Sequence, residues 1–451
     1  MVCSRQSTDI FIVGGGPAGL AAAIAARQKG LQVIVADGAA PSIEKPCGEG
    51  LMPETLAALR TLGVEINAEE GQRFCGISFV QGDARVSADF PQGHGMGLRR
   101  RLLHERLVAR AEECGAQFLW KTPVCGIDGE SVQLSHEKVR ARWIVGADGQ
   151  GSRVRRWSGL TTKSSKQRRA SRRHYRVKPW SNYVEIYWGS HVQAYVTPVG
   201  VEQVCIVIMS ERMERASFDT ALQELPELKE RLLGAELSSR EQGAVTSMHL
   251  LHNVQRRNVA LVGDASGGVD AITGEGLRLA FQQAFALVDS MVAGDLGRYE
   301  PLHRELARRP TVMGNLMLWL GRNPCIRGRV IRALDGKPEL FARLLATHVG
   351  RIRPAELFSA GALLGWRLLA VWVRETGRAC GGRGRIPHQV CYRHSQERAA
   401  KFSCFPSIVG GVQIFCHFPQ LHRRICAKAG HHSIEQQYER NDRNDIREKQ
   451  S

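Results

Sequence analysis

The sequence contains few aromatic residues, 6% of 451, and they do not alternate with basic residues. A nucleic-acid-binding surface of the stacking type needs both, because bases stack on aromatic rings beside cations. The formal net charge of +18 is instead concentrated in two places: residues 151–180 hold 11 Lys and Arg and no acid, and residues 371–451 carry about +7. We therefore expect no nucleic-acid partner, and interpret the basic run as a strip that faces phosphate groups or anionic lipid.

A metal-binding cysteine pattern and a leader segment are also lacking. None of the twelve cysteines forms a CxxC pair or lies at a zinc-type spacing from histidine, so we expect free thiols and no metal site. The first apolar stretch, DIFIVGGG at 9–16, is too short for a secretion signal and runs straight into a turn. The expected location is cytoplasmic, with peripheral contact with a membrane as an open alternative.

Residues 9–37 have the pattern of a βαβ unit: an apolar strand, a glycine turn, an alanine-rich helix and a second strand that ends in Asp37. In the GxGxxG turn, Gly14 makes the tight bend, Gly16 lets the backbone approach a pyrophosphate, and Gly19 lets helix and strand pack closely. The free N–H groups at the helix start attract phosphate. Since Asp37 can accept from a ribose hydroxyl, the unit predicts a bound dinucleotide.

The rest of the chain alternates in character. Residues 99–120 predict a helix followed by a strand, and residues 172–209 read as several antiparallel strands. The chain returns to a buried strand just before residue 264, and residues 276 to about 370 are mostly helical in pattern. Beyond 373 we expect a disordered basic tail, because its cysteine spacings of 11, 13, 12 and 10 residues fit no zinc module.

Three motifs stand in order: GGGPAG at 14–19, GADGQGSRVR at 146–155 and LVGDASGGVDAITGEGL at 261–277. In this order they resemble the FAD-binding oxidoreductases that include the para-hydroxybenzoate hydroxylase superfamily and the geranylgeranyl reductases. The resemblance covers residues 9 to about 370. It implies an α/β (α+β) fold whose parts are a discontinuous Rossmann-like FAD-binding domain (8–170 with 245–300), an inserted antiparallel-sheet substrate domain (171–244), C-terminal helices (301–372) and the tail (373–451).

The resemblance also implies how the cofactor is held. The first loop grips the adenosine and pyrophosphate, Arg100 bonds the phosphates, the late segment binds the ribityl part, and the helix after TGEG points its N–H groups at the N1/C2=O edge of the flavin ring. The implied cofactor-binding residues are Gly14, Gly16, Pro17, Ala18, Gly19, Asp37, Arg100, Asp148, Gly149, Gly263, Asp264, Gly274, Gly276 and Leu277.

The stretch KPCGEGLMPETLAALRTLGV, at 45–64, resembles the glycine-rich loop that lies near the flavin ring in geranylgeranyl-reductase-like flavoproteins. Cys47 and Glu49 are therefore the candidate catalytic residues; the alternative for Cys47 is a buried bystander thiol. The late segment lacks the histidine and paired prolines that usually follow the GD aspartate in aromatic hydroxylases, which favours a reductase.

The resulting hypothesis is an NAD(P)H-dependent FAD enzyme that reduces a double bond in a hydrophobic prenyl, quinone or polyketide-like substrate, with Cys47 or Glu49 as proton donor. Monooxygenation of an aromatic or polyketide substrate is the close alternative, because that chemistry belongs to the cofactor. An alternative of another class is a non-enzymatic prenyl- or lipid-binding protein. The choice between NADH and NADPH, the substrate's identity and the oligomeric state stay open.

Overall fold

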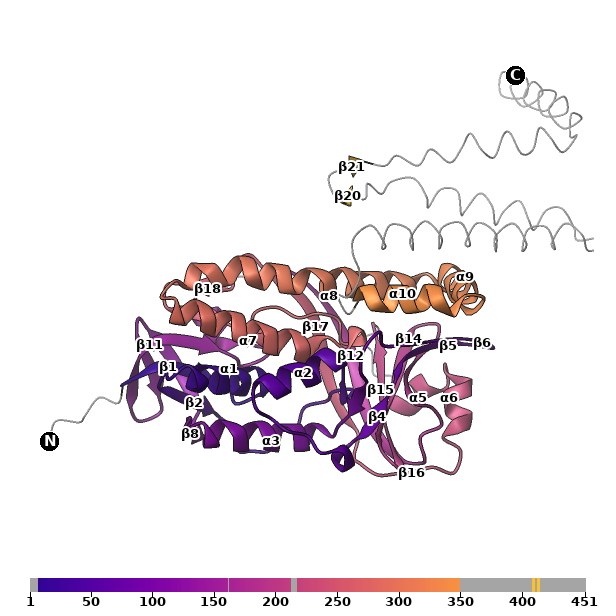
Figure 1. Cartoon of the computed structure of the whole chain (residues 1–451), viewed down its shortest axis with the longest axis horizontal. Coiled ribbons are helices and arrows are strands. Elements are labelled where there is room, and N and C mark those ends of the chain that lie inside the picture. The colour runs from indigo at the N-terminus through magenta and orange to yellow at the C-terminus, as the bar shows by residue number, and fades with distance from the viewer. Residues whose placement is uncertain (1–6, 161, 212–216, 349–407, 410–411, 414–451) are drawn as a thin grey trace, which may run out of the picture. The chain divides into compact units, whose positions relative to one another are not determined.

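The computed structural model describes residues 7–160, 162–211, 217–348, 408–409 and 412–413. The tail expected to be disordered lies outside these residues, apart from the short hairpin of β20 (Ile408–Val409) and β21 (Val412–Gln413). The chain divides into two compact units, Met1–Arg378 and Ala379–Ser451, and the hairpin belongs to the second. Every other described element belongs to the first unit; Figure 1 labels most of these elements.

A largely parallel sheet organises the N-terminal part, and β1 (Ser7–Val13) lies at its centre. Its order is β18-β19-β11-β1-β2-β8, and all neighbouring pairs from β19 to β8 run parallel. The other strands are β2 (Val33–Asp37), β8 (Gln117–Trp120), β11 (Lys138–Gly146), β18 (Gln255–Arg256) and β19 (Val259–Leu261), with β9 (Val124–Asp128) and β10 (Ser131–Leu134) attached through β11.

Both faces of this sheet are covered, which explains why β1 is apolar on both sides. Ile10 and Ile12 point into one hydrophobic core, and Phe11 and Val13 point into another. The predicted Rossmann-like fold is confirmed by this parallel order.

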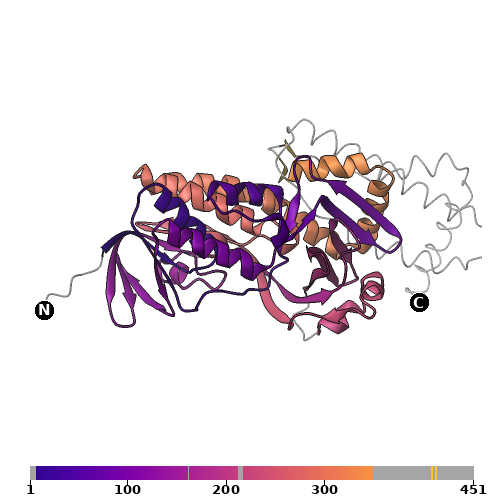
Figure 2. The same ribbon diagram turned by 60° about the horizontal axis from the view of Figure 1, so that its bottom comes forward.

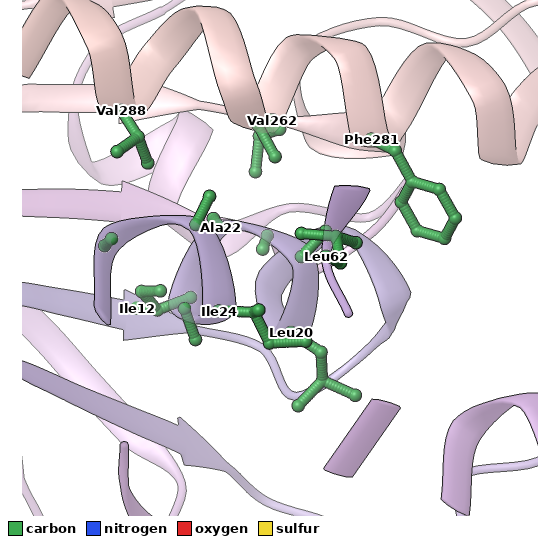
Figure 3. Close-up of a cluster of buried hydrophobic side chains, with 14 of the residues drawn as sticks. Ile12, Leu20, Ala22, Ile24, Leu62, Val262, Phe281 and Val288 are labelled. Carbon is green, nitrogen blue, oxygen red and sulfur yellow. The ribbon is translucent and has the colours of Figure 1, made fainter. Parts of the chain in front are cut away.

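Helices α1 (Pro17–Gln28), α3 (Arg100–Glu113) and α7 (Gly276–Val292) cover one face, and α1 packs against both of the others. Small side chains on α1 allow the close approach: Figure 3 shows Ala22 beneath Val288 of α7 and Val262, the residue after β19. The alanine run of the sequence therefore encodes helix packing as well as helix propensity.

The second sheet has the order β16-β12-β15-β14-β13-β5-β6, with β17 paired to β12, and only β13 and β5 are parallel neighbours. It is assembled from segments on both sides of the predicted 171–244 range. Its strands are β5 (Gly76–Gln81), β6 (Ala84–Asp89), β12 (Thr162–Arg176), β13 (Tyr183–Trp188), β14 (Val192–Gly200), β15 (Gln203–Ser210), β16 (Glu236–Leu237) and β17 (Gln242–Leu251).

Outer helices complete the unit. Figure 2 shows the orange helices beside the purple strands β5 and β6, and both α9 and α10 contact β6. The remaining elements are β3 (Gly50–Leu51), β4 (Gln72–Phe74) and β7 (Gly95–Gly97) in a small sheet, and the helices α2 (Pro53–Thr61), α4 (Arg153–Trp157), α5 (Phe218–Leu222), α6 (Pro226–Arg231), α8 (Tyr299–Arg322), α9 (Pro324–Asp335) and α10 (Pro338–His348).

Candidate active site

A cavity of about 850 Å³ lies between the parallel sheet and the second sheet. Every predicted site residue except Gly19 lines it: Gly14, Gly16, Pro17, Ala18, Asp37, Cys47, Glu49, Arg100, Asp148, Gly149, Gly263, Asp264, Gly274, Gly276 and Leu277. The fold thus brings three motifs and one loop, which are far apart in the sequence, to a single cavity.

The first glycine turn presents bare backbone to this cavity. Gly14 has a φ of +113°, and a Cβ there would lie 2.4 Å from the carbonyl oxygen of Ala147. At Gly16 a Cβ would meet no protein atom within 4 Å, so the adjoining space is open to a ligand. Gly19 packs inward instead, since its Cβ would lie 2.0 Å from the Gly14 carbonyl oxygen. With the start of α1 uncapped by any side chain, the turn has the form of a phosphate-binding loop.

Two side chains hold this turn in place through Gly15. The Nε2 of buried His104 lies 2.8 Å from the Gly15 carbonyl oxygen, which only accepts, so Nε2 carries the proton. Burial lowers the pKa of His104 and keeps the ring neutral at neutral pH. The Gly15 N–H donates to Asp37 Oδ2 at 2.7 Å. His104 was not predicted, because in the sequence it stands on a helix like an ordinary core residue.

The late glycine-rich segment returns to the same cavity after β19. Lys45 Nζ donates to Asp264 Oδ2 at 2.8 Å, which joins segments 219 residues apart. Lys45 was not predicted either, although it begins the KPCGEG loop. Helix α7 begins at Gly276, where a Cβ would meet nothing within 4 Å, and no side chain caps it. Its N-terminal dipole therefore favours negative charge in the cavity.

The middle motif uses its aspartate internally. Asp148 Oδ1 accepts from the Ser152 hydroxyl at 2.5 Å, and Oδ2 accepts from the N–H groups of Arg153 and Val154 at 2.7 and 3.1 Å. These N–H groups open α4, so Asp148 holds the start of that helix. Gly149, with a φ of +78° and open space beside it, is the part of the motif that exposes backbone to the cavity.

Arg100 offers the cavity a cation. It lines the cavity, and its Nε is buried with no hydrogen-bond partner among the described residues. A buried donor of this kind is destabilising unless a ligand satisfies it. Together with the open backbone at Gly16 and Gly276, this donor fits the phosphates and flavin edge of FAD.

Glu49 occupies a buried network of hydrogen bonds. Its Oε1 accepts from Arg172 Nη1 at 3.1 Å and from the Arg100 N–H at 3.0 Å, and its Oε2 accepts from His174 Nε2 at 2.7 Å. Burial by itself would raise the pKa of Glu49, but the bonds from His174 and Arg100 outweigh it and lower the pKa. An ionised carboxylate held by three donors has no proton to give, so the predicted role of acid does not fit Glu49. It anchors the loop instead.

Cys47 remains the candidate proton donor of that loop. It is half-buried, lines the cavity and forms no disulfide, and its sulfur accepts from the Glu49 N–H at 3.4 Å. The loop also touches the second sheet, because a Cβ on Gly48 would lie 2.0 Å from Cε2 of Tyr195. The loop therefore joins the two ends of the cavity.

Two arginines of the basic run at 151–180 are used inside the protein. On β12, Arg168 and Arg172 are buried and alternate with more exposed neighbours. Arg168 pairs with Asp270 at 2.9 Å, and Arg172 pairs with Glu44 at 2.7 Å besides its bond to Glu49. Strand β12 thus fastens both the KPCGEG loop and the late segment. The expected phosphate-facing strip is not formed by these two arginines.

The second-sheet end of the cavity has an apolar wall. Alternate residues of neighbouring strands point into it, because side chains of a strand alternate between its two faces. The apolar lining residues from this sheet include Ile77, Ala170, Val184, Ile186, Val207 and Ala244.

One cluster of ligand-type side chains includes Glu49, which itself lines the cavity. Atoms of Glu49, His174 and Cys205 all lie within 4.8 Å of one another. However, the Glu49 carboxylate already pairs with Arg172, and Arg99 Nε lies 3.5 Å from it. Burial raises the pKa of Cys205 well above its usual range and keeps it a thiol, a poor metal ligand. The cluster does not fit a cation.

Within the described ranges, no helix combines the length and the apolar character needed to cross a bilayer.

The chain matches a family model, curated relatives and solved structures. The family described as "FAD binding domain" matches residues 7–295. A menaquinone reductase from Mycobacterium tuberculosis is 28% identical over 323 residues, which cover 66% of this chain and 79% of that protein. A digeranylgeranylglycerophospholipid reductase from Methanothermobacter thermautotrophicus is 27% identical over 339 residues, covering 68% of this chain and 84% of that protein.

Solved structures agree in fold. A geranylgeranyl bacteriochlorophyll reductase-like protein from Thermoplasma acidophilum superimposes with a TM-score of 0.60 at 19% identity, covering 79% of this chain and 96% of that one. A p-nitrophenol 4-monooxygenase from Pseudomonas putida gives 0.65 at 18% identity, covering 76% and 98%. At these identities the likeness concerns the fold alone.

Proposed function

Because the chain belongs to the FAD binding domain family and is an FAD-dependent oxidoreductase, we propose that it uses NADH or NADPH to reduce a carbon–carbon double bond in a hydrophobic prenyl-, quinone- or polyketide-like substrate. The relatives named as menaquinone and digeranylgeranylglycerophospholipid reductases support this choice. The monooxygenase neighbour shares the fold, which both chemistries use.

The observation that carries the proposal is one continuous cavity with a nucleotide grip at one end and an apolar wall at the other. The KPCGEG loop spans the two ends: Lys45 pairs with Asp264 of the late segment, and Gly48 packs against Tyr195 of the second sheet. Cys47 lies in this loop. A hydrophobic substrate against the apolar wall therefore lies beside the thiol and the cofactor end.

The division of labour follows from this geometry. When bound, FAD would supply the chemistry of hydride transfer between a nicotinamide and the substrate. The protein's part is to hold it: Arg100 and the N-terminus of α1 bind the phosphates, and the N-terminus of α7 favours the charge of the reduced ring. The Cys47 Sγ holds the proton that the second carbon of the double bond needs. The apolar wall excludes water from the thiol and from the flavin ring.

Anaerobic turnover is the direct test. Purified protein loaded with FAD, NADPH or NADH and a short-chain prenyl quinone should, in the absence of oxygen, yield a product whose prenyl chain is still heavier by two hydrogens after the quinone ring has been reoxidised. Cys47→Ala should slow reduction of the substrate double bond at least tenfold. The rate at which the nicotinamide reduces the flavin should not change. Cys125→Ala, at an exposed thiol, is the matched control and should change neither rate. Strict dependence on O₂, with oxygen incorporated into the product, would replace the reductase by a monooxygenase.

A further inference from the structure

We infer that Tyr195 and Thr197, on β14, form a polar subsite in the apolar wall that binds an oxygen atom of the substrate. The inference rests on the proposed function and specifies its substrate class: an apolar chain joined to a head that carries a carbonyl or hydroxyl oxygen.

The first ground is the state of the two hydroxyl groups. Thr197 lines the cavity and is fully buried, and its Oγ1 has no hydrogen-bond partner within the described part of the chain. Tyr195 lines the same cavity, and its side chain is half-buried. Buried hydroxyls are nearly always hydrogen-bonded in folded proteins, so the unpartnered Thr197 hydroxyl, with the Tyr195 phenol two residues away in the same cavity, indicates a ligand with a matching acceptor.

The second ground is position. Residues two apart on a strand share a face, so the two hydroxyls stand on the cavity side while Val196 packs into the core behind. Both lie against the KPCGEG loop. A Cβ on Gly48 would lie 2.0 Å from the Tyr195 ring, and a Cβ on Gly50 would lie 3.6 Å from Thr197 Cγ2. The absence of a side chain at Gly48 leaves room for the Tyr195 ring.

The third ground is the contrast with the surroundings. The neighbouring lining residues Ile186, Val207 and Ala170 are apolar, so the two hydroxyls are polar points in an apolar stretch of that wall. Burial raises the pKa of Tyr195 well above its usual range, which keeps the phenol protonated and able to donate. A plain hydrocarbon would leave both groups unsatisfied, whereas an oxygen-bearing head satisfies them and places the adjoining chain beside Cys47.

The test compares two ligands of equal shape: a short prenyl naphthoquinone and the same prenyl naphthalene without oxygens. Dissociation constants are measured by calorimetry on FAD-loaded, oxidised protein, so no turnover is needed. The wild type should bind the quinone at least tenfold more tightly, because a site built to hydrogen-bond rejects the analogue that lacks the partner. Tyr195→Phe with Thr197→Val should reduce the preference to twofold or less.

Tyr183→Phe is the matched control, since Tyr183 lies on the neighbouring strand β13 and bonds Asp89 outside the cavity. It should keep the full preference. FAD stoichiometry and melting temperature verify that each variant is folded. If the double variant does not fold, the wild-type ratio and Tyr195→Phe alone decide. Equal binding of both ligands by the wild type, or an unchanged preference in the folded double variant, overturns the inference.

The two proposals fail separately. If the protein reduces double bonds but does not prefer the quinone, the subsite is wrong and the reductase function stands. If the protein prefers the quinone but does not reduce its double bond, the subsite stands and the reductase function is wrong.

Discussion

The two ends of the cavity are built differently. At the parallel-sheet end, backbone faces the ligand, at Gly14, Gly16 and Gly276. At the second-sheet end, side chains face the cavity, and Arg172 and Glu49 form a buried ion pair there. Backbone N–H donors do not change when side chains are substituted, so the parallel-sheet end suits a cofactor that stays the same while substrates differ. A side-chain wall changes with each substitution, so that end suits a particular substrate.

The largest expected effect concerns the buried network. Arg172→Met removes one of the three donors to Glu49, whose side chain is 0% exposed, and should lower the free energy of unfolding by about 3 kcal/mol, because the buried carboxylate loses its hydrogen-bonded guanidinium. Arg173→Met is the control next to it on β12: its partners Asp219 and Glu241 are more exposed, so the loss should be below about 1 kcal/mol. Urea unfolding measures both. Equal losses of unfolding free energy in the two variants would mean that the buried network contributes no more to stability than an exposed ion pair.

A second prediction asks whether the parallel-sheet end also depends on a side chain. His303 on α8 lies 2.9 Å from the Ser266 hydroxyl in the late segment, and burial lowers its pKa from 6.5 to about 4. Between these two pKa values, His303 is therefore protonated in the unfolded state and neutral in the folded state. The neutral ring's contribution is fully present above pH 6.5 and is lost as the pH falls towards about 4, by up to about 3 kcal/mol.

Urea unfolding across that pH range checks this prediction. His303→Gln should flatten the pH dependence, while His191→Gln, at an exposed histidine, should leave it as in the wild type. A slope unchanged by His303→Gln would show that other groups control acid sensitivity.

A third prediction separates two glycines of one turn. Gly14→Ala forces a side chain into a φ of +113° and against the Ala147 carbonyl, so we expect a loss of about 2 kcal/mol in unfolding free energy. Gly16→Ala adds a methyl group to open space, so stability should change by less than about 0.5 kcal/mol, yet FAD affinity should fall. Urea unfolding without cofactor and FAD titration distinguish them. Loss of stability at Gly16 would contradict an open backbone there.

The smallest effect is expected at Lys45, whose bond to Asp264 is 45% and 39% exposed at its two side chains. Lys45→Met should change stability by no more than about 0.5 kcal/mol, because solvent screens such pairs. Asp264→Ala should weaken FAD retention, measured as flavin released on dialysis. Equal flavin retention in both variants and the wild type would remove this pair from the cofactor grip.

Much of the cofactor end could be predicted because its residues act locally. A βαβ pattern, a GxGxxG turn and a strand followed by TGEG each describe one short segment, and each segment forms a wall of the cavity. Asp148 shows the limit of local patterns: its motif predicts contact with the cofactor, but its carboxylate accepts from the N–H groups at the start of α4. Glu49 shows it again, since the sequence contains no sign that His174 and Arg172 would meet it.

By itself, the sequence determined where the backbone must turn and expose its N–H groups, because a glycine's φ and a helix start depend on neighbours within a few residues. Only the tertiary structure decided which side chains meet. Pairing in the second sheet places Tyr195 and Thr197 against a loop about 150 residues earlier, and the inward face of β12 carries Arg168 and Arg172 to two loops more than 200 residues apart. Those contacts depend on strand register and on the packing of distant segments, which no local pattern contains.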